Sequence, residues 1–463
     1  MTSVAVVGGG ITGLAAALRL RDRLGPAAEI TIFEQGSELG GKLRTGRLAG
    51  VPAEYGADAF LMRDPGGVGD SAAVALIRRV GLGDQLVHPS RLPPAILLDG
   101  ELEPMPGGTL LGVPGDLTRL PAAIPVQPER DFDRGHPVLG GGDTTVGELV
   151  RQRLGDQVVA RLVDPMLGGV YAGRADELSL QATMPGLAAA ATDAHTLTGA
   201  VRAALAASPR PTGSPVFGSL RGGIGELPPA VAAASGATIR LGLPVRELVP
   251  AADRWRLTVG PTPDPQRVTV DGVVLAVPAR PAARLLETVD PAVAGAVGQL
   301  DYASVALVTV ALPPATPLPR LSGFLIPADE GLTTKAVTFV TQKWPERHGD
   351  DDPVLVRASI GRYGEPGPLQ STDDELVRLV SRELSDVLGG VPDPLASHVQ
   401  RWGGALPQYP VGHPARMARV RSTLPAGLAV AGAGYDGVGI PACVRSGETA
   451  AEQVSTVLEE STL

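Results

Sequence analysis

The chain has 463 residues, 44% of them apolar, and a formal net charge of −9. This length predicts a globular protein with two or more packed regions, because single cores rarely keep growing beyond about 250–300 residues. The acidic balance disfavours nucleic acid as a partner, since phosphate binding needs clustered lysine and arginine side chains. The single cysteine, Cys443, excludes an internal disulfide and indicates a reducing compartment, with the cytoplasm as the expected location.

The N-terminal residues lead directly into an apolar strand, without the charged region and cleavage site of a signal peptide. The most apolar later stretch, residues 302–312, is shorter than the roughly 20 residues that span a bilayer. We therefore expect neither export nor a transmembrane helix.

The first predicted elements form a dinucleotide-binding opening. A short apolar strand, a glycine-rich turn of sequence GGGITG and an alanine-rich helix are predicted in succession at residues 4–7, 8–13 and 14–20. Gly8 permits the tight turn, Gly10 lets the backbone approach a pyrophosphate, and Gly13 lets the helix pack close to the strand. The helix N-terminus then points at the phosphates.

A second strand and a second glycine pair strengthen this prediction, because a lone glycine motif is weak in a chain with 60 glycines. The strand at residues 29–34 ends in Glu34, whose carboxylate can accept hydrogen bonds from a ribose diol. The following Gly40, Gly41 and Lys42 can approach the diphosphate and ribityl chain of a longer cofactor. Together these features favour FAD over NAD.

Later elements alternate between helical and strand patterns. A hairpin and loop region at about 93–114 precedes three predicted helices at 145–154, 157–163 and 197–207. Strands are then expected at 238–241, 255–259, 268–270 and 271–278, and a further sheet at 304–312, 336–341 and 354–361 with a helix at 373–388 behind it. The chain closes with an apolar strand at 428–432 and a helix at 441–458, with Pro441 in its first turn.

This order predicts the α/β fold class: a Rossmann-like FAD-binding domain, an interleaved β-sheet substrate-binding domain and a helical insertion. The FAD-binding domain is expected to be discontinuous, at residues 1–66, 215–290 and 405–463. Residues 67–114 and 291–404 would form the substrate-binding domain, and residues 115–214 the insertion.

Four further segments carry a resemblance that covers essentially the whole chain. They are DPMLGGVYAG at 164–173, KWP at 343–345, ALPQY at 405–409 and GVGIP at 437–441. With the N-terminal motif, they resemble the protoporphyrinogen/coproporphyrinogen oxidase family, and most closely its soluble members from Gram-positive bacteria and actinobacteria. The resemblance implies an amine-oxidase-like fold and one non-covalent FAD per chain. The flavin would carry the redox chemistry.

The implied activity is a six-electron oxidation of coproporphyrinogen III to coproporphyrin III in haem biosynthesis, with oxygen as acceptor and hydrogen peroxide as by-product. Protoporphyrinogen IX oxidation is the nearest alternative. A different flavin amine or carotenoid oxidoreductase, or a porphyrin carrier with a structural FAD, remains open. Implied partners are the porphyrinogen, molecular oxygen and, transiently, a downstream ferrochelatase.

The resemblance also implies which residues contact FAD. They are Gly8, Gly10, Ile11, Thr12, Gly13, Glu34, Gly40, Gly41, Lys42, Gly56, Ala57, Val245, Gly432, Val438, Gly439 and Ile440. The helix after Pro441 would turn its N-terminal dipole toward reduced flavin. One departure follows Gly432, where Ala433 and Gly434 stand in place of the acidic or polar residue that related flavoproteins often carry near the ribityl chain. Cys443 is interpreted as a small buried hydrophobe and not as a covalent flavin attachment.

A substrate with four propionates needs several cations around an apolar slot. The candidates are Arg63, Arg174, Lys335 and Arg362, each of which could instead be a solvated surface charge. Tyr171 is the best candidate for stacking on a macrocycle, although a buried aromatic residue more often packs a core. The six histidines show no metal-ligand spacing, so we expect no metal site and name no catalytic acid or base.

Overall fold

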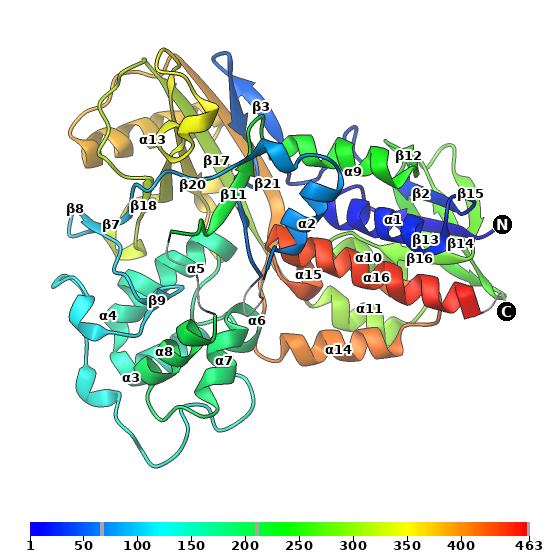
Figure 1. The fold of residues 1–463 in the computed structure, drawn as a ribbon, viewed down its shortest axis with the longest axis horizontal. Helices are drawn as coiled ribbons and strands as arrows, with labels where there is room; N and C mark the ends of the chain where they lie inside the picture. Colours follow the sequence, from blue (N-terminus) through cyan, green and yellow to red (C-terminus); the bar gives the residue numbers. More distant parts are fainter. Residues whose placement is uncertain (65–68, 209–212, 461–463) are drawn as a thin grey trace.

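The computed structural model of the chain describes residues 1–64, 69–208 and 213–460 (Figure 1). Its first sheet is entirely parallel and has the strand order β12-β2-β1-β16-β22. These strands span Thr238–Arg240, Glu29–Phe33, Ser3–Val7, Gly272–Leu275 and Leu428–Val430. The sheet thus assembles strands from the beginning, middle and end of the chain, which confirms the Rossmann-like prediction.

Both faces of this sheet are covered. In β1, Val4 and Val6 face a core shared with helices α1 (Ile11–Leu24), α9 (Leu227–Ser235) and α16 (Ile440–Glu460). Ala5 and Val7 face the core that includes the antiparallel strands β13 (Val245–Ala251), β14 (Arg254–Val259) and β15 (Gln266–Val270). Two-sided burial explains why β1, β16 and β22 are apolar runs without alternation. Figure 1 shows α1 and α16 lying side by side along the sheet.

The second sheet has seven strands in the order β21-β17-β20-β19-β18-β7-β8. The strands span Ala396–Pro407, Tyr302–Leu312, Val354–Ile360, Thr334–Phe339, Gly323–Leu325, Pro94–Leu98 and Glu101–Pro104. All neighbours pair antiparallel except β18 and β7. Helix α13 (Asp373–Leu388) packs Leu376, Val380 and Leu384 against one face, as predicted, and its start is fixed by a capping box between Thr372 and Glu375.

Two local predictions differ from the structure. The strand expected at 336–341 ends at Phe339, because a short helix, α12 (Val340–Lys343), begins there. The helix expected at 157–163 is a short α-helical turn, α4 (Asp156–Val158), and a π-helical turn, η4 (Val159–Val163), which continue into α5 (Asp164–Tyr171). Pro165 has no N–H to donate to Arg161, so the regular α-helical ladder is interrupted at this point.

The helical part of the chain also contains α3 (Val146–Leu154), α6 (Leu180–Thr183), α7 (Pro185–Ala191) and α8 (Leu197–Ala207). The helices predicted at 145–154 and 197–207 are confirmed. Figure 1 shows this group beside the seven-stranded sheet and apart from α1 and α16. No helix in the described parts of the chain combines the length and apolarity needed to cross a bilayer.

Helix α2 (Ala72–Arg79) lies in the range expected for substrate binding, yet its buried side chains belong to the core of α1 and α16. A mostly apolar helix carries no signal for which core it joins. The division of the chain into an FAD-binding domain, a substrate-binding domain and an insertion stays a prediction.

Candidate active site

The turn between β1 and α1 shows why three of its positions are glycine. A Cβ on Gly8, whose φ is +110°, would lie 2.4 Å from the Ala276 carbonyl oxygen, and one on Gly13 would lie 2.0 Å from the Gly8 oxygen. Those two glycines are required by packing. Gly10 has no atom within 4 Å of its Cβ position, so its side of the turn is open. An open backbone surface beside a helix N-terminus fits a diphosphate.

Glu34 lies across this turn at the end of β2. One carboxylate oxygen accepts from the Gly9 N–H at 2.8 Å, and the other accepts from the Gly36 N–H at 2.7 Å. Because a carboxylate offers about four acceptor positions, ribose hydroxyls can still bind here. The Leu243 N–H donates to the Glu34 carbonyl at 3.0 Å, which places the start of β13, with Val245, at the same end of the site.

The second glycine pair lies against the first. The Gly40 N–H donates to the Gly9 carbonyl at 2.9 Å, and the Cβ position of Gly41 is 3.5 Å from the Gly10 Cα. Burial lowers the pKa of Lys42, and Cys443 opposes this effect. The structure therefore brings together, around the open side of Gly10, predicted contacts that are thirty positions apart in the sequence.

Gly56 and Ala57 lie on the other side of Lys42. A Cβ on Gly56 would be 1.9 Å from the Lys42 carbonyl oxygen, and the Ala57 N–H donates to the same oxygen at 3.1 Å. The close approach of the two backbones explains glycine at position 56. Residues 56 and 57 thus lie against the backbone of Lys42, directly after the Gly40–Gly41 turn.

The C-terminal helix completes this region. The Gly432 N–H donates to the Ser446 hydroxyl at 2.8 Å, and the Cβ position of Gly432 is 3.7 Å from the Thr12 hydroxyl. Helix α16 begins at Ile440, directly after Val438 and Gly439. Burial raises the pKa of the Cys443 thiol. At Ala433, where the sequence departs from related flavoproteins, the backbone carbonyl accepts a hydrogen bond from the Tyr409 hydroxyl.

A recess between α5 and the seven-stranded sheet brings together three of the predicted substrate residues, Arg174, Lys335 and Arg362. Lys335 is only 5% exposed, and its Nζ donates to the Gly168 carbonyl at 3.0 Å. Burial, with a smaller effect of Arg362, lowers the pKa of Lys335 to about 7. Arg362 donates to the Ile326 and Leu332 carbonyls at 3.3 Å each.

Acidic groups limit the positive charge of this recess. Arg174 forms an ion pair with Glu365. Asp164 also lines the recess, accepts from the Ala175 N–H at 2.6 Å, and has a pKa raised by burial. Lys335 and Arg362 form no ion pair with any carboxylate of the described residues within 4.0 Å. The recess, about 310 Å³ including its open mouth, suits one acidic arm of a ligand better than a whole tetrapyrrole.

Two predicted substrate residues lie elsewhere. Arg63 is half-buried beyond strand β5 (Phe60–Leu61) and does not line the recess. Tyr171 is buried in the core and packs edge to face on Tyr409, with ring centroids 5.8 Å apart. Its carbonyl accepts from the Gln408 amide at 2.8 Å. The substrate contacts of Arg63 and Tyr171 stay predictions.

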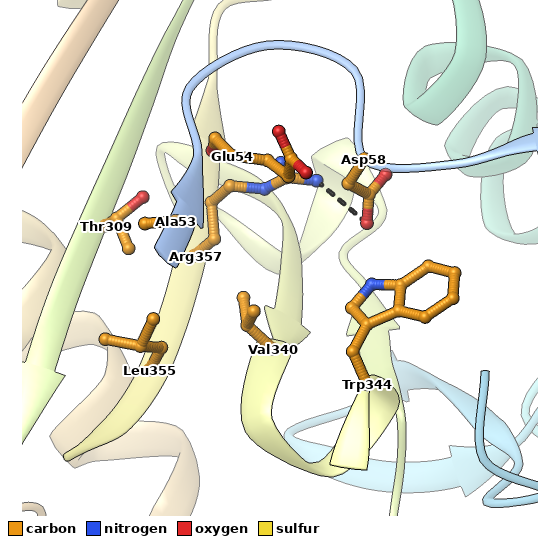
Figure 2. Close-up of a pocket in the computed structure, with 8 residues that line it drawn as sticks. All are labelled: Ala53, Glu54, Asp58, Thr309, Val340, Trp344, Leu355 and Arg357. Carbon is orange, nitrogen blue, oxygen red and sulfur yellow. Dashed lines mark hydrogen bonds and ion pairs between the residues drawn. The ribbon is translucent and has the colours of Figure 1, made fainter. Parts of the chain in front are cut away.

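One buried polar cluster was not predicted from the sequence. Figure 2 shows Arg357 of β20 pointing toward Asp58, with Glu54, Trp344 and Thr309 around it. One feature of the sequence could have indicated this cluster: the charged residue Arg357 inside the apolar strand sequence VLVRASI of β20. A buried arginine at such a position indicates an acidic or carbonyl partner elsewhere in the chain, but not which one.

These features define a class of protein. A parallel sheet with a glycine-rich first turn, an acid at the end of the second strand and a C-terminal helix aimed at the same site is typical of an FAD-binding flavoprotein. The chain belongs to the family of flavin containing amine oxidoreductases, whose model matches residues 11–455. It is an FAD-dependent oxidoreductase with the amine-oxidase-like fold.

Similar proteins refine this assignment. The coproporphyrinogen III oxidase of Mycobacterium tuberculosis is 38% identical over 99% of this chain and 97% of its own length. The coproporphyrinogen III oxidase of Bacillus subtilis is 28% identical, with 98% of both chains covered. A crystal structure from Exiguobacterium sp. 255-15, provisionally described as a protoporphyrinogen oxidase, superposes with a TM-score of 0.84 at 32% identity over 99% of both chains.

Proposed function

We propose that this chain oxidises coproporphyrinogen III to coproporphyrin III, with oxygen as electron acceptor, as a step of haem biosynthesis. The observation that carries the proposal is the 38% identity with coproporphyrinogen III oxidases along almost the entire chain. The recess of Lys335 and Arg362 supports it, because a buried lysine and a half-buried arginine without an ion-pair partner among the described residues favour an acidic ligand.

The residues around Gly10 fit FAD, since the open backbone surface there would accept a diphosphate. We assign to this cofactor the contacts predicted from the sequence at the β1–α1 turn, Glu34, the Gly40–Lys42 segment, Gly56–Ala57, Val245 and the start of α16. When bound, FAD accepts two electrons per step and passes them to oxygen, so that three steps remove six hydrogens and form three molecules of hydrogen peroxide. The N-terminus of α16 favours negative charge near it.

For the substrate, we assign Lys335 and Arg362 to one propionate. Lys335 is held by the Gly168 carbonyl and Arg362 by the Ile326 and Leu332 carbonyls, so both are oriented before a ligand arrives. Such preorganisation reduces the entropy lost on binding. Arg174 would contribute if the ligand displaced Glu365 from it.

Oxidation of protoporphyrinogen IX is the second candidate. It is favoured by the Exiguobacterium structure and by the chloroplastic protoporphyrinogen oxidase 1 of Arabidopsis thaliana, which is 29% identical over 97% of this chain. That substrate has two propionates, and a single recess with two unpaired cations does not distinguish two carboxylates from four. The oxidation rates of the two porphyrinogens have to be compared to decide between them.

We further propose the cytoplasm as the location and a transient contact with a ferrochelatase that receives the product. The first rests on the single cysteine and the second on the family resemblance alone. A pull-down of ferrochelatase with the purified chain tests the contact, and loss of the complex at moderate salt is expected for a transient interface.

The two substrates are separated by initial rates of porphyrin fluorescence in air. The FAD-loaded protein is given coproporphyrinogen III or protoporphyrinogen IX in parallel, with heat-denatured protein as the control for spontaneous oxidation. The proposal predicts faster catalysed oxidation of coproporphyrinogen III. Equal or reversed rates would make protoporphyrinogen IX the substrate, and no catalysed rate with either would reject both.

A further inference from the structure

The loop that follows β4 (Val51–Glu54) is anchored to the seven-stranded sheet through consecutive backbone carbonyls. We call residues 54–58 the connecting segment. Arg357 of β20 donates to the Glu54 carbonyl at 3.4 Å and to the Gly56 carbonyl at 3.2 Å. Trp402 of β21 donates from its indole nitrogen to the Tyr55 carbonyl at 2.7 Å. Two side chains from strands on either side of β17 thus hold three successive carbonyls.

Ion pairs reinforce this anchorage. The Asp58 carboxylate lies 2.8 Å from the Lys343 Nζ. It also lies 3.3 Å from an Arg357 guanidinium nitrogen, the ion pair marked in Figure 2. Burial alone would raise the pKa of Asp58, but Lys343 and Arg357 outweigh it and hold that pKa well below its ordinary range. At the other end of the segment, Glu54 forms an almost fully buried ion pair with Arg347 at 3.0 Å.

The connecting segment also binds the chain that follows the Gly40–Gly41 turn. The Tyr55 N–H donates to the Arg44 carbonyl at 2.9 Å, and the Ala57 N–H donates to the Lys42 carbonyl at 3.1 Å. The chain of Lys42 continues directly from Gly41, which lies against Gly10. Carbonyls of the connecting segment therefore bind side chains of the sheet, while N–H groups of the same segment bind the chain that forms the cofactor site.

We propose that Arg357 and Trp402 are positioning residues, which act through the connecting segment to hold the FAD contacts Gly56 and Ala57 at a fixed place relative to the seven-stranded sheet. The inference rests on the proposed FAD contacts of Gly56 and Ala57, and it is independent of which porphyrinogen reacts. Neither side chain needs to touch the cofactor.

An alternative is that these bonds only stabilise the fold. Removing one partner of a buried ion pair destabilises a protein, because the other charge is left uncompensated. The alternative therefore predicts lower unfolding temperatures and unchanged cofactor binding. Positioning predicts changed cofactor binding even where the apoprotein remains folded. The two are separated by measuring FAD affinity without any substrate.

The test uses Arg357→Met and Trp402→Phe, with Arg401→Met as the matched control. Asp58 keeps its bond to Lys343 in the first variant, and the second removes the indole donor together with part of the ring beside Gly56. Arg401 also lies in β21 and donates to two carbonyls, of Leu369 and Ser371, but on the side of Asp373 and α13. FAD is titrated into each apoprotein, and the absorption spectrum of the bound flavin and the apoprotein unfolding temperature are recorded.

We expect Arg357→Met to raise the FAD dissociation constant about tenfold and Trp402→Phe to raise it a few-fold, in the range of lost single hydrogen bonds. The absorption spectrum of the bound flavin should shift in both variants. In the double variant the FAD dissociation constant should rise by less than the product of the two single increases, because both side chains hold one segment. Arg357→Lys should recover part of the affinity, since lysine reaches Asp58 but lacks the guanidinium fork.

Wild-type FAD affinity and spectrum in Arg357→Met would overturn the proposal, even if turnover fell. An equal loss of affinity in Arg401→Met would overturn it as well, because it would trace the loss to the sheet in general. Since no porphyrinogen is used, a wrong substrate assignment leaves the result unaffected.

Discussion

Glycines of the first turn have separable roles at the level of single residues. Gly13 is required by packing, because a Cβ there would meet the Gly8 carbonyl oxygen at 2.0 Å. Gly10 has ordinary extended dihedrals, with φ −73° and ψ 175°, and open space around its Cβ position. Of these two glycines, Gly13 is therefore needed for the fold of the apoprotein, whereas Gly10 is needed where a ligand approaches.

We expect Gly10→Ala to fold with wild-type stability and to bind FAD at least about tenfold more weakly, because its methyl group enters the space of the diphosphate. Gly13→Ala should lower the stability of the apoprotein by about 1–3 kcal/mol or more. Chemical denaturation of the apoproteins and FAD titration check both. Full FAD affinity in Gly10→Ala would refute the assignment of this turn to the diphosphate.

Lys335 gives the substrate site a pH dependence. Its pKa in the folded protein, about 7, lies below its ordinary value, so the folded protein loses the proton first as pH rises. We expect KM for coproporphyrinogen III to rise as pH increases above about 7, since the neutral amine no longer attracts a propionate. A bound carboxylate would itself raise the pKa of Lys335 and move this change upward.

The lowered pKa of Lys335 also makes the stability of the folded protein depend on pH. Above pH 7 the unfolded chain binds more protons at this lysine than the folded one, so folding stability at this site rises with pH. Lys335→Met should abolish the pH dependence of KM and, by removing a buried charge, keep or raise the unfolding temperature. Steady-state kinetics across the pH range check this, and an unaltered KM profile in the variant would remove Lys335 from the substrate site.

At the level of elements, the contact of α1 with α16 depends on a glycine in the second helix. A Cβ on Gly447 would lie 2.2 Å from the Thr12 carbonyl oxygen, which belongs to the backbone of α1 and cannot move aside cheaply. This close approach also brings Ser446 to Gly432. The relative position of the two helices is thus linked to the C-terminal part of the cofactor site.

We expect Gly447→Ala to destabilise the protein by about 1–3 kcal/mol through overpacking and to weaken FAD binding. Gly295→Ala is the control: Gly295 lies in helix α11 (Pro291–Gly298), with no atom within 4 Å of its Cβ position. There the substitution should stabilise by up to about 1 kcal/mol. Denaturant unfolding of both variants checks the pair, and equal effects at the two positions would contradict the packing account.

Local patterns predicted the cofactor turn because each residue's role there depends on neighbours in sequence. The same reasoning failed at 336–341, where β-branched residues continue past the end of β19 into the helix α12. It could not find the contact of Trp402 with Tyr55, which joins residues 347 positions apart. Nor could it show that Tyr171 turns into the core toward Tyr409, since that depends on the packing around α5.

For the whole molecule, Asp58 links the cofactor region to the seven-stranded sheet. Its pKa in the folded protein lies below the unfolded value of about 3.9. Its contribution to stability is therefore fully present above that value and is lost as pH falls further. The link should hold throughout the neutral range and weaken only in acid.

We expect Asp58→Asn to destabilise the protein by about 1–3 kcal/mol at neutral pH, with the difference from wild type shrinking below about pH 4. Denaturant unfolding of both proteins at several pH values measures it. A difference that stays constant down to pH 3 would show that the ion pairs of Asp58 do not carry the effect.

The most direct test of the account is to mix the FAD-loaded protein with coproporphyrinogen III without oxygen and record the flavin absorption. The account predicts that the yellow flavin is bleached when it takes two electrons from the porphyrinogen, and that its colour returns, with porphyrin and hydrogen peroxide, when air is admitted. A flavin that stays oxidised while porphyrinogen is present would contradict the assignment of this chain as a porphyrinogen-oxidising flavoenzyme.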